Sequence, residues 1–318
     1  MSPRIITLTV NPALDIACST DQVRHTHKIR TGDDHLDPGG GGINVARVLH
    51  ELGGDTLAVL MAGGVTGALV EELLDEAGVP RHTVPIRGRT RICFTVFERS
   101  TGLEYRFVPE GPTVTQRDWH AMLNALDTLE GDWIVASGSL EHGMPTDIYA
   151  WVARAARRRN QRFVLDTSGP ALTAALGSGI ELIKPSLGEL EALVGRPLPD
   201  PAEQEAEALA LVRGGAARLV AVTLGEAGAF VAAPHGVTRI PAVPISVRSA
   251  VGAGDSFTAG MTLALARGDT LEEALAWGVA AGTAAVVCAG TARVRKADVE
   301  AQYQRLRPGA CLPAAPPL

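Results

Sequence analysis

Short runs of apolar, β-forming residues alternate with amphipathic segments along most of the chain, and this alternation constrains the fold more than any other feature. The runs are nearly continuous in apolar residues, as strands buried on both faces of a parallel sheet are. They comprise residues 4–10, 56–61, 133–137, 163–166, 182–184 and 219–224. The segments between them have helical periodicity and comprise residues 43–52, 67–77, 146–159, 202–213 and 255–266. The pattern predicts βαβ units and a mainly parallel sheet between two layers of helices, an α/β fold.

Two segments do not follow this alternation. Residues 17–37 are polar and rich in Thr, and residues 89–108 alternate in polarity around residues 100–102, as a hairpin would. Both are predicted to be antiparallel and half-exposed, and to form either a small β-sheet lid or ordinary surface hairpins. The end of the chain, residues 311–318, is rich in Pro and Ala and is expected to be disordered.

Composition excludes several classes of protein. The chain has 318 residues and a formal net charge of −6, and 46% of its residues are hydrophobic, far more than a disordered chain carries. No apolar run reaches the roughly 18–20 residues of a membrane span, and the start of the chain does not have the pattern of a secretory signal. The acidic balance does not favour nucleic acid as a partner. Cys18, Cys93, Cys288 and Cys311 lack the spacing of a zinc site or a disulfide framework, so we expect reduced cysteines in a cytoplasmic protein.

Only three of the 29 basic residues are lysines: Lys28, Lys184 and Lys296. A phosphate-binding P-loop has Gly directly before the Lys and Ser or Thr directly after it. None of the three lysines follows a glycine. A Walker-type ATP site is therefore excluded.

A run of four glycines, residues 39–42, leads directly into a helical segment that carries Asn44. Glycines let the backbone approach a ligand closely, and the start of a helix offers free N–H groups. The alternative is a flexible loop, but four glycines within one helical turn cost stability unless they are used. The run is not a dinucleotide fingerprint, because Asn44 stands where the third glycine belongs.

A second glycine-rich turn, residues 62–67, follows a predicted strand and opens a helix. It comes closer to the dinucleotide fingerprint, with Ala62 in the first glycine position, and is the best support for an NAD-dependent dehydrogenase. A tight strand-to-helix turn explains the same residues equally well.

The third motif spans residues 249–257 and precedes an apolar helix. Gly252 and Gly254 permit a tight turn, and the N–H groups of Ala253, Gly254 and Asp255 are expected to point out of a helix N-terminus, where they can hold an anion. The carboxylate of Asp255 in the same turn could accept a proton from a hydroxyl held beside it. The alternative role for Asp255 is that of a simple helix cap.

Residues 39–46 and 251–255 together resemble the two signatures of the phosphofructokinase B (ribokinase-like) carbohydrate kinases, and the resemblance extends from Ile5 to about Val294. Within the family, residues 7–15 look like the phosphosugar kinase branch, as do residues 105–108, 137–140 and 166–169. Tagatose-6-phosphate kinases and 1-phosphofructokinases usually have Lys inside the glycine run. This chain has Gly41 there, which is similar to the minor 6-phosphofructokinases.

The resemblance implies a ribokinase-like three-layer α/β/α sandwich with a mainly parallel sheet. Residues 1–310 would form a single kinase domain, into which the lid segments, about 16–37 and 88–108, are inserted. It also implies a chemistry: transfer of the γ-phosphoryl group of ATP to the C1 hydroxyl of fructose 6-phosphate, with Asp255 as general base and the N–H groups of residues 252–254 stabilising the transferred group. The alternatives are tagatose 6-phosphate or fructose 1-phosphate as acceptor, and a sugar-phosphate-binding sensor without catalysis, against which the intact residues 252–255 argue.

The family's substrate-binding roles fall on a set of residues around the glycine run and the lid. Asp15 matches a ligand of the sugar hydroxyls, and Arg91 and Lys28 match ligands of the sugar's phosphate, with Lys28 supplied by the lid of a neighbouring subunit. The full substrate-binding set implied is Asp15, Lys28, Gly40, Gly41, Asn44, Arg91, Arg106 and Ser139, with Arg30 as a further helper. For each arginine the alternative is a solvated surface charge.

The nucleotide half looks like segments 184–186 and 223–228 and the helix around Gly282. The residues implied there are Lys184, Ser186, Thr223, Leu224, Gly225, Gly228 and Gly282. The chain departs from the family at Ser186, where an Asn normally helps Glu189 to organise Mg²⁺. The need for Mg²⁺ remains, since it screens the triphosphate during transfer. A monovalent cation loop for K⁺, built from backbone carbonyls, would involve Ser249, Val251, Ala285, Cys288 and Gly290.

The expected partners are therefore small molecules, ATP and a phosphorylated ketose. The lid would have exposed edges and apolar alternation at Ile92, Phe94 and Val96, and such edges seldom stay uncovered. A homodimer that pairs two lids is expected.

Overall fold

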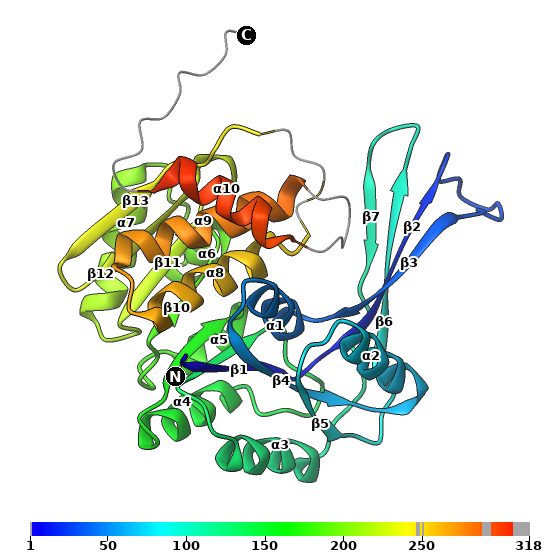
Figure 1. Ribbon diagram of the computed structural model, residues 1–318, viewed down its shortest axis with the longest axis horizontal. Coiled ribbons are helices and arrows are strands. Elements are labelled where there is room, and N and C mark those ends of the chain that lie inside the picture. Colours follow the sequence, from blue (N-terminus) through cyan, green and yellow to red (C-terminus); the bar gives the residue numbers. More distant parts are fainter. Residues whose placement is uncertain (1, 246–248, 250, 288–293, 308–318) are drawn as a thin grey trace, which may run out of the picture.

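A nine-stranded sheet forms the centre of the molecule (Figure 1). The computed structural model describes residues 2–245, 249, 251–287 and 294–307. The order of the strands in the sheet is β13-β12-β11-β10-β9-β8-β1-β4-β5. Their bounds are β1 Arg4–Thr9, β4 Asp55–Ala62, β5 Arg81–Pro85, β8 Trp133–Ser137, β9 Arg162–Asp166, β10 Leu182–Ile183, β11 Leu219–Thr223, β12 Ala229–Ala233 and β13 Gly236–Ile240. All neighbours from β11 to β5 pair in parallel, which confirms the predicted parallel sheet.

The two strands at one edge, β12 and β13, are antiparallel to their neighbours, and the sequence reading did not separate them as strands. They form a hairpin joined by Pro234 and His235. Every residue of β12 is buried, so this strand, which lies between β11 and the edge strand β13, belongs to the core rather than to the surface.

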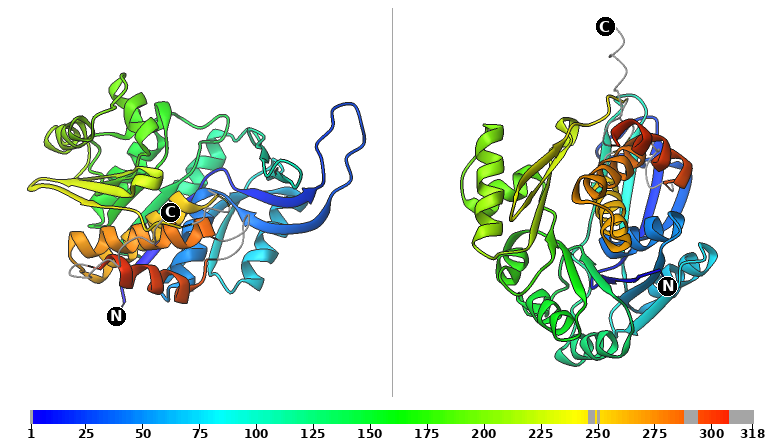
Figure 2. Two further views of the ribbon diagram at one scale, coloured as in Figure 1. Left: turned by 90° about the horizontal axis from the view of Figure 1, so that it is seen from above. Right: turned by 60° about the vertical axis from the view of Figure 1, so that its left-hand side comes forward.

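Helices cover both faces of the sheet, as the alternation of strands and helices requires. One face packs against α3 Gln116–Thr128, α4 Ile148–Arg158, α5 Gly169–Ala175, α6 Leu187–Val194 and α7 Pro201–Arg213. The other face packs against α1 Gly41–Glu51, α2 Gly64–Glu76, α8 Ala253–Arg267, α9 Leu271–Val287 and α10 Lys296–Leu306. The result is the predicted three-layer α/β/α sandwich (Figures 1 and 2). Among the described residues, no helix is both long and apolar enough to cross a membrane.

A separate four-stranded sheet, called the small sheet below, projects from one side of the sandwich (Figure 1). Its order is β3-β2-β6-β7, with bounds β2 Ala13–Thr20, β3 Gly32–Gly39, β6 Arg91–Glu98 and β7 Glu104–Phe107. The pairs β2–β3 and β6–β7 are antiparallel, as expected of the two segments. The central pair β2–β6 is parallel and joins the two hairpins into one sheet, a pairing that the sequence did not predict. The two hairpins come from distant parts of the chain, and they meet with β2 and β6 running in the same direction.

The turn at residues 62–67 is explained by packing. Gly63 caps α2, and a Cβ there would overlap the backbone oxygens of Ile86 and Gly88. The close approach of these backbones requires glycine, so the turn supports the tight-turn interpretation rather than a dinucleotide site.

Candidate active site

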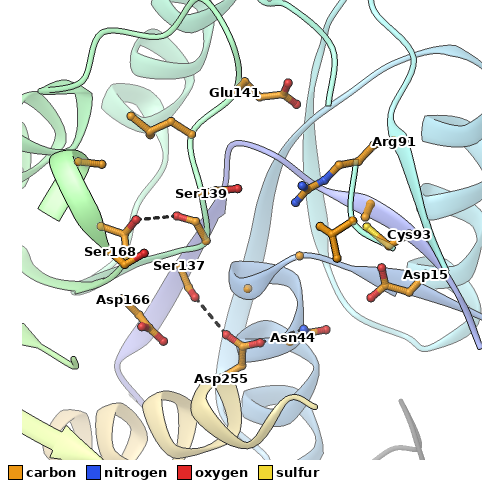
Figure 3. Close-up of a pocket in the computed structure, with 18 of the residues that line it drawn as sticks. Asp15, Asn44, Arg91, Cys93, Ser137, Ser139, Glu141, Asp166, Ser168 and Asp255 are labelled. Carbon is orange, nitrogen blue, oxygen red and sulfur yellow. Dashed lines mark hydrogen bonds between the residues drawn. The ribbon is translucent and has the colours of Figure 1, made fainter. Parts of the chain in front are cut away.

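A cavity of about 710 Å³ lies where the small sheet faces the carboxyl ends of the central strands (Figure 3). In parallel α/β sheets this end of the strands is where ligands bind. Many of the predicted residues line the cavity together: Asp15, Gly40, Gly41, Asn44, Arg91, Arg106, Ser139, Glu189, Val251, Gly252 and Asp255. These residues are distant in the sequence, and the fold brings them to one place.

The first turn of α8 forms one wall of the cavity. Gly252 caps this helix with φ 74°, a left-handed conformation that favours glycine. Because the first N–H groups of a helix have no carbonyl partner within it, the N–H groups of Ala253 and Gly254 are available to an anion. A Cβ at Gly254 would lie 3.4 Å from Lys184 Nζ, so a cation stands beside the same helix start.

Asp255 is the third residue of α8 and is half-buried at the cavity wall. Asn44 Nδ2 in α1 donates a hydrogen bond of 2.9 Å to Asp255 Oδ2, and Ser137 Oγ at the end of β8 donates one of 3.1 Å to Oδ1 (Figure 3). Desolvation and the nearby Asp166 raise the pKa of Asp255 to about 6, against the effect of the two hydrogen bonds. The carboxylate is therefore held in one orientation and is basic enough to take a proton near neutral pH.

An ion pair lies beneath this wall. Lys184 Nζ lies 3.2 Å from Asp166 Oδ1, and both side chains are largely buried. Thr258 Oγ1 donates a hydrogen bond of 3.1 Å to Asp166 Oδ2. Burial opposes the charge of the lysine, but Asp166 and Glu189 more than offset it and raise the pKa of Lys184. The lysine stays charged and contributes positive potential beside the start of α8.

Asp15 lies on β2 at the opposite side of the cavity (Figure 3). Desolvation and the neighbouring Asp37 raise the pKa of Asp15, while Arg106 and Arg91 lower it. A Cβ at Gly39 would overlap the Asp15 carboxylate, so the first glycine of the run makes room for this side chain. The second and third glycines line the cavity beside Asn44.

The backbone holds the guanidinium group of Arg91 in place. Its two terminal nitrogens donate hydrogen bonds of 2.8 Å to the carbonyl oxygen of Pro109 and 3.0 Å to that of Asn11. Arg106 lies on β7, the strand that pairs with the strand of Arg91, and Ser139 lies in the loop after β8. A fixed arginine, a second arginine and a hydroxyl at one end of a cavity form a site suited to a phosphate group.

The residues expected on the nucleotide side lie at the ends of β10 and β11. Ser186 forms a bridge with Thr223, and the turn at Gly225–Ala227 follows directly. Ser186 caps α6 together with Glu189: its hydroxyl and its N–H donate to Glu189 Oε2 at 2.9 and 2.7 Å. The Ser-x-x-Glu spacing is a capping-box signature that the sequence reading missed.

Several predicted residues lie away from the cavity. Lys28 is exposed in the loop between β2 and β3 and does not line the cavity of its own chain. Gly282 lies on α9, where a Cβ would come within 3.3 Å of the carbonyl oxygen of Ala253, so helix packing accounts for this glycine. The N–H of Ser249 donates to the carbonyl oxygen of Val286 at 3.4 Å, which brings Ser249 next to the end of α9, where Ala285 lies. Cys288 and Gly290 lie outside the described residues, as does the segment 311–318.

Two residues of the site were not assigned a role from the sequence. Ser137 and Asp166 are the last residues of β8 and β9. A polar residue at the carboxyl end of each of two predicted parallel strands is a signal that could have been used, because neighbouring strands end at the same edge. Their pairing with Asp255 and Lys184 depends on tertiary structure and could not be predicted from the sequence.

The residues present fit a divalent cation held mainly by phosphates. Asp166, Glu189 and Asp255 all line the cavity. Among the described residues, Glu189 Oε1 has no hydrogen-bond partner, while Oε2 accepts the hydrogen bonds of the helix cap. No group of three His, Cys, Asp or Glu side chains is close enough to hold a metal alone within the part of the chain that the structure describes. Mg²⁺ typically binds through one or two carboxylates, waters and substrate phosphates, which agrees with this arrangement.

Comparison with known proteins supports the family that the two glycine motifs resemble. The pfkB family of carbohydrate kinases matches residues 9–297. The ATP-dependent 6-phosphofructokinase isozyme 2 of Mycobacterium tuberculosis is 45% identical over 304 residues, which cover 95% of this chain and 89% of that protein.

Solved structures agree with the fold. The structure of phosphofructokinase-2 from Escherichia coli in complex with substrates and products superimposes with a TM-score of 0.91 at 38% identity, covering 95% of this chain and 99% of that chain. The Arabidopsis thaliana ribokinase structure, complexed with ribose and ATP, is 22% identical with a TM-score of 0.76 over 96% of this chain and 99% of that one, and shows the ribokinase-like fold alone. The cavity, the two glycine motifs and these similarities lead to one conclusion: the chain belongs to the pfkB family of carbohydrate kinases.

Proposed function

We propose that this kinase transfers the γ-phosphoryl group of ATP to the C1 hydroxyl of fructose 6-phosphate and produces fructose 1,6-bisphosphate and ADP. The observation that carries the proposal is the position of Asp255. This carboxylate is fixed by Asn44 and Ser137 at a helix start and faces a cavity whose other end holds Arg91 and Arg106. A sugar with a phosphate at one end and a reactive hydroxyl at the other matches that separation of base and cations.

The transfer is an in-line displacement. Asp255 accepts the proton of the C1 hydroxyl, the oxygen forms a bond to the γ-phosphorus, and the bond from that phosphorus to the β-γ bridging oxygen breaks, so that ADP leaves. The N–H groups of Ala253 and Gly254 stabilise the charge on the transferred group, and Lys184 adds positive potential behind them. The small sheet, acting as a lid, would exclude water that otherwise hydrolyses ATP.

The sugar is held from the small sheet and from the start of α1. Asp15 accepts hydrogen bonds from hydroxyl groups, and Gly40, Gly41 and Asn44 close around the ring. Arg91, with Arg106 and Ser139, binds the phosphate of the sugar.

The nucleotide lies across the ends of β10 and β11, against Ser186 and the turn that follows Thr223, with Gly228 ending that turn. Glu189 is the carboxylate best placed to hold the water shell of Mg²⁺, which would be bound to the phosphates of ATP and would neutralise their charge during transfer. K⁺ would be bound by the backbone carbonyls of Ser249 and Val251 and of the end of α9, where Ala285 lies.

The small sheet carries an apolar face suited to a second copy of the chain. The strand register places Ile16 beside both Leu36 and Phe94, and Phe94 beside Phe107. The side chains of Leu36, Phe94 and Phe107 are 42%, 42% and 59% exposed. Residues of this size seldom stay in water over a contiguous patch, so a dimer formed through this sheet is the arrangement we propose.

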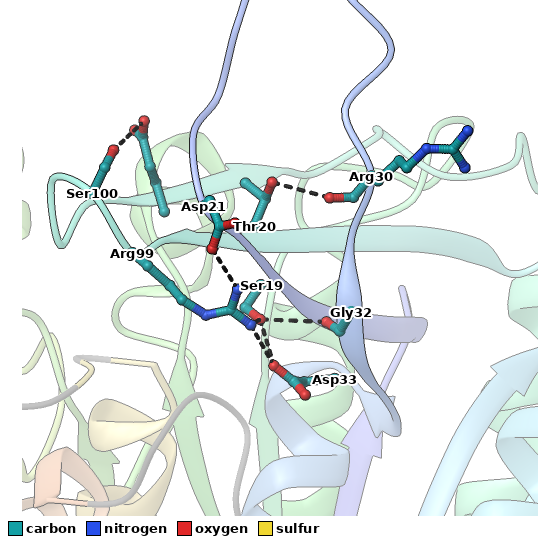
Figure 4. A network of polar contacts seen from close by, with 9 residues as sticks. Ser19, Thr20, Asp21, Arg30, Gly32, Asp33, Arg99 and Ser100 are labelled. Atoms are coloured by element: carbon teal, nitrogen blue, oxygen red, sulfur yellow. Dashed lines mark hydrogen bonds and ion pairs between the residues drawn. The ribbon is translucent and has the colours of Figure 1, made fainter.

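The same dimer would bring Lys28 to a neighbouring cavity. The loop that carries it is closed at its base by Arg99, which binds Asp21 and Asp33 at 2.9 and 2.7 Å (Figure 4). The loop extends away from its own sandwich (Figure 2). A partner subunit could therefore receive Lys28 at the phosphate end of its cavity.

A coupled ADP-release assay tests the proposed function with fructose 6-phosphate, tagatose 6-phosphate and fructose 1-phosphate side by side. We expect the highest kcat/KM with fructose 6-phosphate. A higher value with either of the other sugars would reassign the acceptor within the same chemistry. Negligible rates with all three would overturn the proposal and favour a sugar-phosphate sensor.

A further inference from the structure

Glu141 is a buried carboxyl group in the cavity for which the proposed mechanism has no use. It lies in the loop after β8, two residues beyond Ser139, and is 3% exposed. Figure 3 shows Glu141, Ser139 and Arg91 around one end of the cavity and Asp166 and Asp255 around the other. Its Oε2 atom has no hydrogen-bond partner among the described residues.

Two further buried polar atoms at this end also lack a partner within the described part of the chain. They are Arg91 Nε, a donor, and Asn11 Oδ1, an acceptor. A Cβ placed on Gly111 would lie 2.6 Å from Asn11 Oδ1 and 3.0 Å from Glu141 Oε2, so the two oxygens flank the same backbone position. Buried polar atoms are normally paired, and the unpaired atoms of Glu141 and Arg91, two residues that line this cavity, indicate a place prepared for a polar ligand.

The surroundings of Glu141 favour its neutral form. Burial raises the pKa of Glu141 to about 8, although the positive charge of Arg91 acts against this. His142, the next residue along the loop, and Glu110, on the adjoining loop, are both exposed, and His142 Nε2 lies 2.7 Å from Glu110 Oε2. Across the cavity, Asp15 and Arg106 belong to the small sheet. At pH 7 the Glu141 carboxyl therefore carries a proton and is a hydrogen-bond donor.

We infer that Glu141, in its protonated form, donates a hydrogen bond to the phosphate group of the sugar substrate beside Arg91 and is thereby a specificity-determining residue of this site. The inference rests on the proposed function, which places that phosphate at Arg91 and Ser139. A phosphate dianion accepts hydrogen bonds and a neutral carboxylic acid supplies one. An ionised Glu141 would place a negative charge against the dianion in a buried environment, where like charges repel strongly. Binding of the sugar phosphate is consequently linked to the proton on Glu141.

The inference predicts a pH dependence of KM for fructose 6-phosphate. The phosphate group of the sugar is a dianion throughout the range from pH 7.5 to 9.5, because its second pKa is about 6. The KM of the unaltered enzyme should rise above about pH 8, approaching tenfold per pH unit, as one proton is lost from the free site. The KM for ATP should not show this rise, because Glu141 lies at the other end of the cavity.

The test is the KM for fructose 6-phosphate from pH 7 to 9.5 in the unaltered enzyme, in Glu141→Gln and in Glu110→Gln. Glutamine keeps the size of the side chain and its donor group but does not titrate, so Glu141→Gln should have a KM that changes less than about threefold over the range. Glu110 is the matched control: it is a carboxylate on the adjoining loop whose side chain is 83% exposed, and its variant should follow the unaltered enzyme. A flat KM in the unaltered enzyme, or an undiminished rise in Glu141→Gln, would overturn the inference.

The outcomes separate this inference from the proposed function. Activity with fructose 6-phosphate at pH 7.5 is measured first and tests the function alone. If another of the three sugar phosphates proves to be the substrate, its KM is followed in the same way. If none is phosphorylated, the inference falls with the function. If Glu141→Gln does not fold, the pH dependence of KM in the unaltered enzyme decides, since a flat profile contradicts the inference by itself.

Discussion

Asn44 donates a 2.9 Å hydrogen bond to Asp255 and thereby joins the first turn of α1 to the first turn of α8, across 211 positions of the sequence. The two glycine-rich helix starts of the chain thus meet at one carboxylate. Ser137, at the end of β8, binds the other oxygen of that carboxylate. The orientation of the proposed base depends on three separate elements of the fold.

The decrease of kcat at low pH, the acid limb of the pH–rate profile, should reflect the protonation of Asp255. Desolvation and Asp166 raise the pKa of Asp255 to about 6, and the base must be ionised to accept a proton, so kcat should fall as pH decreases through about 6. Ser137→Ala removes a hydrogen bond that stabilises the ionised form, which should move this limb to higher pH. Ser168→Ala, which alters a hydroxyl at the cavity wall without a bond to Asp255, should leave the limb where it is. An identical limb in Ser137→Ala would contradict this account.

Gly41 is expected to tolerate no side chain. A Cβ at this position would overlap Ser137 Oγ and lie 2.9 Å from Ser137 Cβ, and the displaced serine would lose its bond to Asp255. One hydrogen bond to a charged group contributes about 1.5–3 kcal/mol, so Gly41→Ala should lower kcat by roughly 10- to 100-fold. Gly32→Ala is the control, because a Cβ there meets nothing within 4 Å. Steady-state kinetics of both variants decide, and equal kcat values would show that the site absorbs the added methyl group.

The overlap at Gly41 also bears on substrate choice within the family. The chain resembles kinases that have glycine here and differs from those that have lysine. The contact with Ser137 explains why a lysine would not fit this cavity without a further change on β8.

Dimer formation should depend on the apolar face of the small sheet. Phe107→Glu places a charge on that face and should convert a dimer to a monomer at micromolar concentration, as measured by sedimentation velocity. If Lys28 of a neighbouring subunit binds the phosphate, KM for fructose 6-phosphate should rise in the same variant. Val65→Glu is the control, since Val65 is 78% exposed on α2, outside the small sheet. A monomer in the unaltered protein with substrate present would refute the proposed dimer.

The buried carboxyl of Glu141 should also appear in stability. Its pKa is raised from 4.5 to about 8 in the folded state, so the folded chain retains a proton that the unfolded chain releases between these values. The stability that this group contributes is fully present below about pH 4.5 and is lost as pH rises through about 8. Glu141→Gln does not titrate, so its free energy of unfolding relative to the unaltered protein should increase from pH 5.5 to pH 8.5. Urea denaturation at the two pH values measures this, and a constant difference would place the ionisation elsewhere.

The local pattern of apolar and polar residues in the sequence was sufficient to predict most of the fold. The apolar runs that become β1, β4, β8 and β9 are buried on both faces of the sheet, and such strands have a clear sequence signature. The parallel pairing of β2 with β6 was not accessible, because each hairpin has an antiparallel pattern and nothing local specifies how the two meet. Strand β12, buried throughout, was missed although Pro234 and His235 mark a short turn after it.

The site was predictable where chemistry lies in short motifs. The helix start at Gly252 and the carboxylate of Asp255 follow from spacing alone. The partners Ser137 and Asp166 come from strand ends whose neighbours only the sheet order reveals. The role of Glu141 could not be predicted, since an acidic residue in a loop is normally exposed, and its burial arises from the packing of the loop around Gly111.

The central claim is that Asp255 is the base in phosphorylation of fructose 6-phosphate, and its most direct test is the kcat of Asp255→Asn in the coupled ADP-release assay. Asparagine keeps the shape of the side chain and one of its two acceptor oxygens but does not accept the proton. We predict a kcat at least ~10²-fold below that of the unaltered enzyme, with KM values for both substrates within a few fold. Glu272→Gln, at an exposed carboxylate in the first turn of α9, should retain full activity. A kcat of Asp255→Asn within about threefold of the unaltered enzyme would contradict the claim.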